Sequence, residues 1–244
     1  MEKSFGKFES EKREYIENIA RDQRLKKLAE EFLGRSLAQK YPYVFSWLGS
    51  PIIQYPADIV AIQEIIWQVK PDLVLETGIA HGGGLILYAS ILELIGKGEV
   101  LGIDVEIRPH NKKAIQTHPL FKRIKMLEGS STDPKIFERV QKIAKGKEKI
   151  LVILDSNHTC AHVKKELELY APLVKKGSYL IVCDTFIEDL PEGAIRDRPF
   201  GKGNNPKIAV EEFLGKNKHF LVDETISSKL LITAFAAGYL KRIK

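Results

Sequence analysis

Cysteine and long apolar runs are both scarce in this chain. Cys160 and Cys183 are the only cysteines among its 244 residues, and their spacing fits neither a disulfide framework nor a CxxC metal or redox motif. No uninterrupted apolar stretch approaches the ~18 residues of a membrane-spanning helix, and the charged N-terminus lacks the apolar core of a signal peptide. We therefore expect a cytoplasmic protein with no membrane span.

The sequence also lacks the marks of a nucleic-acid-binding protein. The net charge is +6, but the lysines are spread along the chain and alternate with acidic residues, and no basic stripe with interleaved aromatic side chains occurs. We therefore expect no nucleic-acid partner. The chain is 44% hydrophobic and has no polar linker, so it has the material for one large globular domain or two small ones.

Apolar runs of strand length alternate with helical stretches through most of the chain. Strands are expected at 73–76, 100–104, 123–127, 149–155, 179–184, 220–223 and 230–234, and helices at 57–69, 83–95, 110–117, 134–145 and 160–175. This alternation predicts an α/β fold with a mostly parallel sheet and helices on both faces. Ligands of such sheets bind beyond the carboxyl ends of the strands, where the strand order reverses.

A charged helical segment at 9–37 precedes the alternating pattern. Its apolar residues fall roughly on one face, so it is expected to lie on the core, to contact a neighbouring subunit or to cover the active site. We divide the chain into an N-terminal helical arm with its connecting loop (1–50) and a main domain (51–244). A homo-oligomer formed through the arm is consistent with this division.

Polar residues gather where the predicted strands end. Those that directly follow an apolar run are Glu76, Asp104, the turn Gly129-Ser130-Ser131, Asp155 and Asp184. Because parallel strands end at the same edge of the sheet, these side chains are expected to share one crevice.

The first strand leads into the turn Glu76-Thr77-Gly78-Ile79-Ala80-His81-Gly82-Gly83-Gly84. Glycine lets the backbone approach a ligand closely, and the amino end of the next helix favours a negative group. The spacing differs from the GxGxxG of dinucleotide enzymes, and Glu76 would repel a pyrophosphate. An acid beside free backbone amides suits a ligand with both an ammonium and a carboxylate, as in the methionine part of S-adenosylmethionine. His81 is expected to contact the cofactor, contact the acceptor or lie outside the site.

The next two strand ends extend the predicted cofactor site. Asp104 is placed to accept hydrogen bonds from ribose hydroxyls, a feature shared with NAD enzymes. Ser130 and Ser131 are expected to meet the adenine edge, to cap the helix that follows Asp133, or both.

Asp155 and Asp184 end strands that the topology makes neighbours. Two facing carboxylates repel, and a hard cation such as Mg²⁺ removes the conflict through oxygen ligands. Such a metal would lower the pKa of an acceptor hydroxyl. His158 lies three residues after Asp155, where it is expected to act as general base or to have a surface or capping role. His162, one turn further on, is expected to face solvent or the helix packing.

A long segment rich in turn-forming residues leaves the sheet after Asp184 and spans 186–206. Loops of this length are usually functional or disordered. We expect either a lid over the acceptor, with Arg196, Arg198, Lys202 and Asn204 as substrate contacts, or a solvated excursion.

Four segments resemble the cephalosporin hydroxylase family over roughly residues 40–235. They are Phe45-Ser-Trp-Leu-Gly-Ser-Pro-Ile-Ile-Gln54, Ile66-Trp-Gln-Val-Lys-Pro-Asp-Leu-Val-Leu-Glu-Thr-Gly-Ile-Ala-His-Gly-Gly83, Asp155-Ser-Asn-His158 and Asp197-Arg-Pro-Phe-Gly-Lys-Gly-Asn-Asn-Pro206. That family has the Rossmann-like class I methyltransferase fold and is similar to metal-dependent macrolide sugar and rhamnosyl O-methyltransferases. The resemblance implies a seven-stranded sheet with the last strand antiparallel, S-adenosylmethionine at 76–84 and Asp104, and Mg²⁺ at the acceptor.

The resemblance also implies roles for single residues. Asp155 matches an aspartate that binds the metal in the macrolide enzymes, and His158 matches their general base. Cys183 departs from the pattern, because those relatives carry Glu-Asp where this chain has Cys183-Asp184. A thiol is a poor partner for Mg²⁺, so the metal either binds more weakly, uses water or Thr185, or is absent.

Rival functions fit the sequence less well. A non-haem iron hydroxylase, which the family name suggests, commonly carries a His-x-Asp/Glu pair, and none of the six histidines has an acid two positions on. An NAD-dependent oxidoreductase fits the fold class but not the glycine spacing. A non-catalytic homologue that keeps the cofactor pocket stays open. The sequence therefore favours an S-adenosylmethionine-dependent O-methyltransferase that acts on a small-molecule hydroxyl, such as that of a sugar or glycosylated metabolite.

Overall fold

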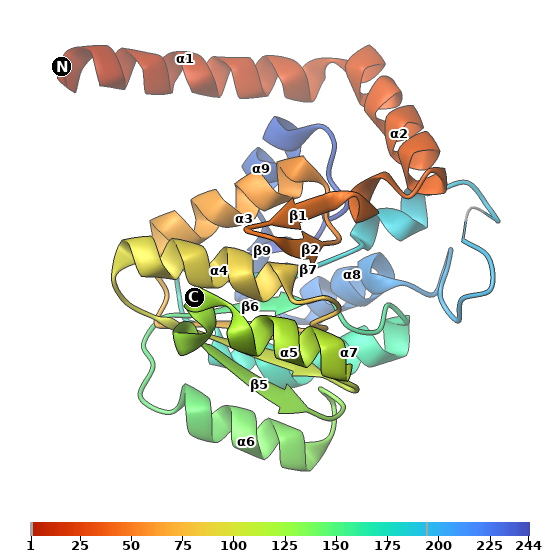
Figure 1. Cartoon of the computed structure of the whole chain (residues 1–244). Helices are drawn as coiled ribbons and strands as arrows, with labels where there is room; N and C mark the ends of the chain where they lie inside the picture. Colours follow the sequence, from red (N-terminus) through yellow and green to blue (C-terminus); the bar gives the residue numbers. More distant parts are fainter. Residues whose placement is uncertain (1, 194) are drawn as a thin grey trace.

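A twisted sheet runs through the centre of the protein (Figure 1), whose computed structural model describes residues 2–193 and 195–244. Its seven strands lie in the order β5-β4-β3-β6-β7-β9-β8. Their bounds are β3 Leu73–Thr77, β4 Glu99–Asp104, β5 Ile124–Glu128, β6 Ile150–Leu154, β7 Tyr179–Val182, β8 Phe220–Val222 and β9 Tyr239–Arg242. Only β9 is antiparallel to its neighbours, β7 and β8. The predicted α/β class and mostly parallel seven-stranded sheet are confirmed.

Helices cover both faces of this sheet, and each face has its own apolar cluster. One cluster includes side chains of α3 (Pro56–Val69), α4 (Gly83–Ile95) and α5 (Pro109–Thr117). The other includes α6 (Pro134–Ala144), α7 (Cys160–Tyr170) and α8 (Pro206–Lys216). Strands β3, β6 and β7 are buried at every position, as expected for parallel strands covered on both sides.

Two of these helices begin at an N-cap residue that is followed by proline, a pattern visible in the sequence. Asp133 precedes Pro134, and its carboxylate accepts hydrogen bonds from the backbone amides of the first turn of α6. Asn205 precedes Pro206, and its side-chain oxygen accepts hydrogen bonds from the first-turn amides of α8, a helix that the sequence interpretation did not predict. Proline in the first turn lacks only an amide that would have no partner there.

The N-terminal arm consists of two helices, α1 (Glu2–Arg21) and α2 (Gln23–Ala38), separated at Asp22, which caps α2. Helix α1 runs across one end of the molecule and packs against α9 (Glu224–Leu230) (Figure 1). A 3-10 turn, η1 (Tyr41–Tyr43), leads into a hairpin of β1 (Phe45–Trp47) and β2 (Ser50–Ile52), which the sequence did not predict.

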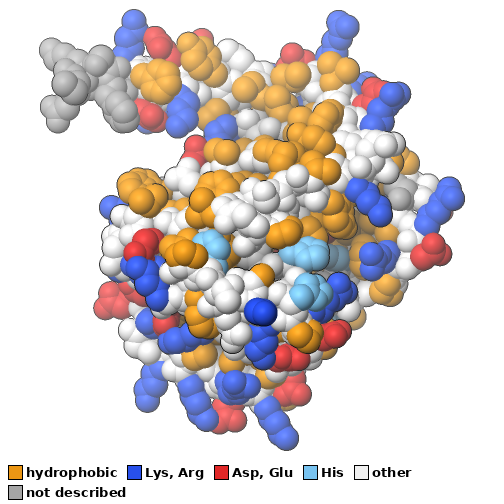
Figure 2. Space-filling model, in the orientation of Figure 1, with side chains coloured by type: hydrophobic (Ala, Val, Ile, Leu, Met, Phe, Trp, Pro, Cys, Tyr) orange, Lys and Arg blue, Asp and Glu red, His pale blue; other side chains and the backbone are white. Residues whose placement is uncertain are grey.

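The arm carries much of the exposed apolar surface of the molecule. Figure 2 shows apolar side chains gathered over the N-terminal helices, whereas acidic and basic side chains are mixed over the opposite end. The large exposed apolar residues of the two helices include Phe8, Tyr15, Leu28 and Phe32. Within the two described ranges, no helix combines the length and apolarity needed to cross a membrane.

The strand predicted at 230–234 is wrong. Residues up to Leu230 belong to α9, Leu231 has a positive φ of 57°, and the last strand is β9. Thr233 and Ala234 donate hydrogen bonds to the buried carboxylate of Asp58 on α3. These residues therefore contact a helix and do not form a strand of the sheet. Tyr239 in β9 donates to the same carboxylate at 2.7 Å. Three 3-10 turns complete the described elements: η2 (Pro119–Arg123), η3 (Ala171–Leu173) and η4 (Thr185–Asp189).

Candidate functional site

A cavity of about 880 Å³ lies at the carboxyl ends of the central strands. Residues from the ends of β3, β4, β6 and β7 line it, including Gly78, Asp104, Asp155 and Asp184. The order of the sheet reverses at β3, since β4 and β5 lie on one side and β6 and β7 on the other. The strand-end residues therefore meet at the switch point where α/β sheets bind ligands.

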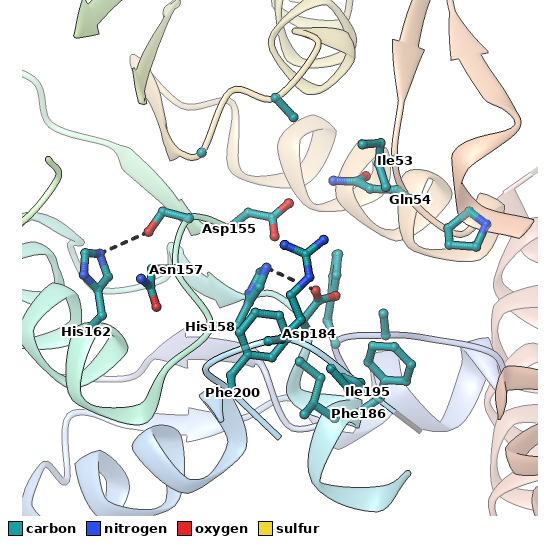
Figure 3. Close-up of a pocket in the computed structure, with 18 of the residues that line it drawn as sticks. Ile53, Gln54, Asp155, Asn157, His158, His162, Asp184, Phe186, Ile195 and Phe200 are labelled. Carbon is teal, nitrogen blue, oxygen red and sulfur yellow. Dashed lines mark hydrogen bonds and ion pairs between the residues drawn. The ribbon is translucent and has the colours of Figure 1, made fainter. Parts of the chain in front are cut away.

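Two carboxylates and one imidazole converge on the floor of this cavity (Figure 3). Asp155, His158 and Asp184 each offer one ligand atom, and these atoms all lie within 4.8 Å of one another. The Nε2 atom of His158 is 3.4 Å from Oδ2 of Asp184. The three residues can hold a divalent cation, or two of them can hold it while the third exchanges a proton.

The two aspartates are costly to ionise without a cation. Desolvation by the surrounding protein raises the pKa of Asp155 well above its usual value, and the charge of Asp184 raises it further. Desolvation also raises the pKa of Asp184, while the nearby imidazole of His158 lowers it. Asp184 has a positive φ of 57° and begins η4, so its side chain is fixed at the turn that leaves the sheet.

Cys183 does not take the place of a third carboxylate. Its side chain is fully buried, and burial followed by the charge of Asp155 raises the pKa of the thiol well above its usual value. The neighbouring thiol lowers the pKa of the Asp155 carboxyl group. His158, and not Cys183, is the third group beside the two aspartates.

Glu76 lies at the end of β3 and is 3% exposed. Tyr88 donates a hydrogen bond of 2.6 Å to its Oε1 atom, and burial raises the pKa of the carboxyl group to about 8. A small annex of the cavity, about 30 Å³, lies between Glu76, Gly84 and Asp155. A Cβ at Gly84 would come within 2.8 Å of the Glu76 carboxylate, so the glycine keeps this annex open.

The turn after β3 is held by contacts that need glycine at one position. Gly78 has φ +90°, and a Cβ there would lie 2.0 Å from the carbonyl oxygen of Asp155. Gly78 and Ala80 line both the cavity and its annex, while His81 and Gly83 line the annex alone. The side chain of Thr77 is buried in the sheet, and Gly82 faces Ile115, so neither lines these spaces.

Asp104 holds the same turn from the next strand. Its Oδ2 atom accepts hydrogen bonds from the amides of Ile79 at 2.7 Å and Ala80 at 3.3 Å, and Oδ1 accepts from Glu106 at 3.2 Å. Asp104 also lines the cavity, as do Ser130 and Ser131 beyond it. The predicted cofactor residues therefore surround one end of the cavity, with Thr77 and Gly82 behind its wall.

The family model described as rhamnosyl O-methyltransferase/CmcI matches residues 39–243. Rhamnosyl O-methyltransferase of Mycobacterium tuberculosis is 34% identical over 203 residues, which cover 81% of this chain and 78% of that protein. The Mycobacterium leprae enzyme of the same name is 32% identical over 81% of this chain and 82% of its own length. The chain belongs to the rhamnosyl O-methyltransferase/CmcI family.

Solved structures with the same fold include members of this family. An apo form of CmcI has a TM-score of 0.60 at 18% identity and covers 83% of this chain and 77% of its own. A caffeoyl-CoA O-methyltransferase assigned in Staphylococcus aureus has a TM-score of 0.53 at 20% identity, over 82% and 92% of the two chains. These likenesses confirm the class I methyltransferase fold that the sequence predicted.

The surroundings of His162 differ from those that the sequence predicted. The sequence interpretation turned it toward solvent or the helix packing, but it lines the cavity (Figure 3). Its Nε2 atom lies 3.1 Å from Oγ of Ser131 and 3.3 Å from Oγ of Ser156. Ser156 in turn donates to the buried carboxylate of Glu166 at 2.8 Å. The position of His162 in the first turn of α7, soon after the strand-end Asp155, was the available signal.

The four residues predicted as substrate contacts separate into two pairs. Arg196 and Arg198 line the cavity, but Lys202 and Asn204 do not. Asn204 instead accepts a hydrogen bond from the amide of Cys160 at the start of α7, at 2.9 Å, and donates to the carbonyl of Pro199. Residue 194, inside the predicted lid, lies outside the described residues.

The end of the N-terminal arm also reaches the cavity. Leu37 of α2 and Pro42 and Tyr43 of η1 line it, as do residues of the 186–206 segment. Tyr43 is 53% exposed at this edge. Part of the arm therefore lies at the cavity, in keeping with the expectation that it covers the active site.

Proposed function

We propose that this protein transfers a methyl group from S-adenosylmethionine to a hydroxyl of a sugar-bearing small molecule, with Mg²⁺ at Asp155 and Asp184 and His158 as general base. One observation carries the proposal: the ends of β3, β4, β6 and β7 bring Glu76, Asp104, Asp155 and Asp184 around a single cavity and its annex. The activity class, an S-adenosylmethionine-dependent O-methyltransferase, follows from the family to which the chain belongs.

The cofactor end of the cavity fits S-adenosylmethionine. The volume of about 880 Å³ lies within the range of cofactor sites, roughly 300–1,000 Å³. The Glu76 carboxylate faces an annex that the absence of a Cβ at Gly84 leaves open, and an ammonium group there would compensate its buried charge. Asp104 keeps lone pairs for ribose hydroxyls besides its contacts to the turn.

The donor set on the cavity floor fits a hard divalent cation. Asp155 and Asp184 supply carboxylate oxygens, the ligands that Mg²⁺ prefers. One solved form of CmcI is a complex with magnesium and S-adenosylmethionine. A cation held by Asp155 and Asp184 would lower the pKa of an acceptor hydroxyl and so ease its deprotonation.

We assign the proton transfer to His158. Since Mg²⁺ favours oxygen over nitrogen, the imidazole is better suited to receive the hydroxyl proton than to bind the metal. The carboxylate of Asp184, 3.4 Å from Nε2, stabilises the positive charge that forms on the ring. The ring of Phe200 packs edge-on against the imidazole at 5.0 Å between centroids, which limits its motion and its access to water.

The acceptor end of the cavity suits a sugar carried on a larger molecule. The 34%-identical relatives are rhamnosyl O-methyltransferases. The aromatic side chains of Tyr43, Phe186 and Phe235 line this end, and Arg196 and Arg198 border it. We place the acceptor here, with the 186–206 segment as a lid, and propose that the exposed apolar face of α1 permits a homo-oligomer.

The iron-hydroxylase alternative gains no support from the cluster on the cavity floor. Its one histidine and two aspartates differ from the two histidines and one carboxylate of the common non-haem iron site. A non-catalytic role does not account for the contact between His158 and Asp184 or for the second aspartate, Asp155, beside them.

Variants of the two ends of the cavity test the proposal. With a rhamnoside acceptor, Asp155→Ala and His158→Ala are expected to lower turnover about 100- to 10,000-fold and leave the affinity for S-adenosylhomocysteine nearly unchanged. Glu76→Ala is expected to weaken cofactor affinity. His110→Ala, at an exposed histidine of α5, is the matched control. Turnover lost on chelation and restored by Mg²⁺ supports the metal, whereas tight binding of NAD without binding of S-adenosylmethionine overturns the function.

A further inference from the structure

Gln54 is a buried side chain with an unmet hydrogen-bonding requirement. It lies between β2 and α3, is 5% exposed, and its Oε1 atom has no hydrogen-bond partner among the described residues. An amide buried without partners costs free energy, so a residue of this kind in a well-packed wall points to a ligand that supplies them.

The amide of Gln54 borders both the large cavity and its annex. In Figure 3 the side chains of Gln54 and Asp155 extend toward one another from opposite sides of the pocket. Glu76 and Gly84 form the remaining polar part of the annex wall. Gln54 comes from a loop outside the sheet, whereas the other polar groups come from strand ends and the glycine turn.

The position of Gln54 is fixed by contacts on both sides of it. Ile52 and Tyr55 are each 2% exposed, and the loop passes directly over the start of α4, where a Cβ at Gly83 would lie 2.2 Å from the carbonyl oxygen of Pro51. Trp47 in the same hairpin donates a hydrogen bond to Ser90 of α4 at 3.0 Å. The carboxamide is therefore held over the annex by a packed loop.

We propose that Gln54 binds the amino-acid head group of S-adenosylmethionine, together with Glu76. A carboxamide both donates and accepts, so Nε2 can donate to the carboxylate of the head group and Oε1 can accept from its ammonium. Glu76 supplies the negative charge that the ammonium requires, and the amino end of α4 favours the carboxylate. This inference rests on the proposed function, because it names a further residue at the proposed cofactor site.

Binding measurements on two ligands test this role. S-adenosylhomocysteine carries the amino-acid head group, and 5′-deoxy-5′-methylthioadenosine lacks it but keeps the adenosine. Gln54→Leu is expected to weaken S-adenosylhomocysteine about ten- to hundredfold, the value of hydrogen bonds to charged groups, and to leave methylthioadenosine unchanged. Gln68→Leu, at an exposed glutamine of α3, is the matched control and is expected to change neither affinity.

The unliganded variant separates ligand binding from a structural role. Because Gln54 makes no hydrogen bond through Oε1, Gln54→Leu is expected to keep or raise the melting temperature of the free protein. A lower melting temperature with equal losses for both ligands would mean that Gln54 supports the loop and would overturn the inference. An unchanged affinity for S-adenosylhomocysteine, or a loss of Mg²⁺ affinity alone, would also overturn the inference. If the wild-type protein binds neither ligand, the proposed function itself fails.

Discussion

Cofactor binding to this protein is expected to release a proton from Glu76. Burial raises the pKa of its carboxyl group to about 8, so the free protein holds this residue largely protonated at pH 7. An ammonium in the annex favours the ionised form, and the proton leaves when the ligand binds. With a pKa near 8, binding at pH 7 releases about 0.9 proton, and the affinity rises about tenfold per pH unit below pH 8 before it levels off.

Calorimetry in buffers of different ionisation enthalpy measures this proton directly. The slope of the observed binding enthalpy against the buffer enthalpy gives the number of protons released when S-adenosylhomocysteine binds. Glu76→Gln cannot titrate and is expected to give a slope near zero with weaker binding. Methylthioadenosine, which lacks the ammonium, is expected to release no proton from the wild-type protein. Net proton uptake, or the same slope for wild type and Glu76→Gln, would refute the coupling.

Two further predictions concern stability. Burial raises the pKa of the fully buried Asp58 to about 6, so the folded state keeps a proton that the unfolded state loses above about pH 4. The free energy of unfolding is therefore expected to fall by about 1.4 kcal/mol between pH 5 and pH 8, as the pH rises through 6. Urea titrations of the wild type and of Asp58→Asn measure this change, and an equal pH dependence in the variant would contradict it. Gly78→Ala is expected to cost more than about 3 kcal/mol, because its Cβ meets backbone, whereas Gly96→Ala, also at positive φ but with open space around it, is expected to cost about 1–2 kcal/mol.

The strand-end acids were predictable because each directly follows an apolar run. A parallel sheet converts that sequence position into a spatial one, since all its strands end at the same edge. Asp155 and Asp184, 29 positions apart by their numbers, therefore meet because β6 and β7 are neighbours. The seven strands and the antiparallel last strand followed from the family resemblance. The sequence misplaced that last strand because the apolar residues at 230–234 look like a strand.

Two residues that reach the cavity from outside the sheet, Gln54 and His162, escaped prediction as site residues. Gln54 follows a three-residue strand that the sequence did not reveal, and its burial depends on the packing of the hairpin against α4. His162 depends on the direction that α7 takes after Asn157, which fixes whether its ring meets Ser131. Lys202 and Asn204 were assigned to the cavity because they lie in a long polar loop, but the cap that Asn204 provides for Cys160 is a tertiary contact with no local signature.

The charges of the cavity explain why two cationic ligands suit one site. Glu76, Asp155 and Asp184 lie around the same buried space, and the ionised form of each of the other two raises the pKa of Asp155. A cation beside one carboxylate therefore makes ionisation of its neighbours less costly. By thermodynamic reciprocity, any change that a divalent metal at Asp155 and Asp184 makes in the affinity for an ammonium at Glu76 equals the change that the ammonium makes in the affinity for the metal. The neutral thiol of Cys183, in place of a further carboxylate, leaves this wall with one less negative charge to compensate.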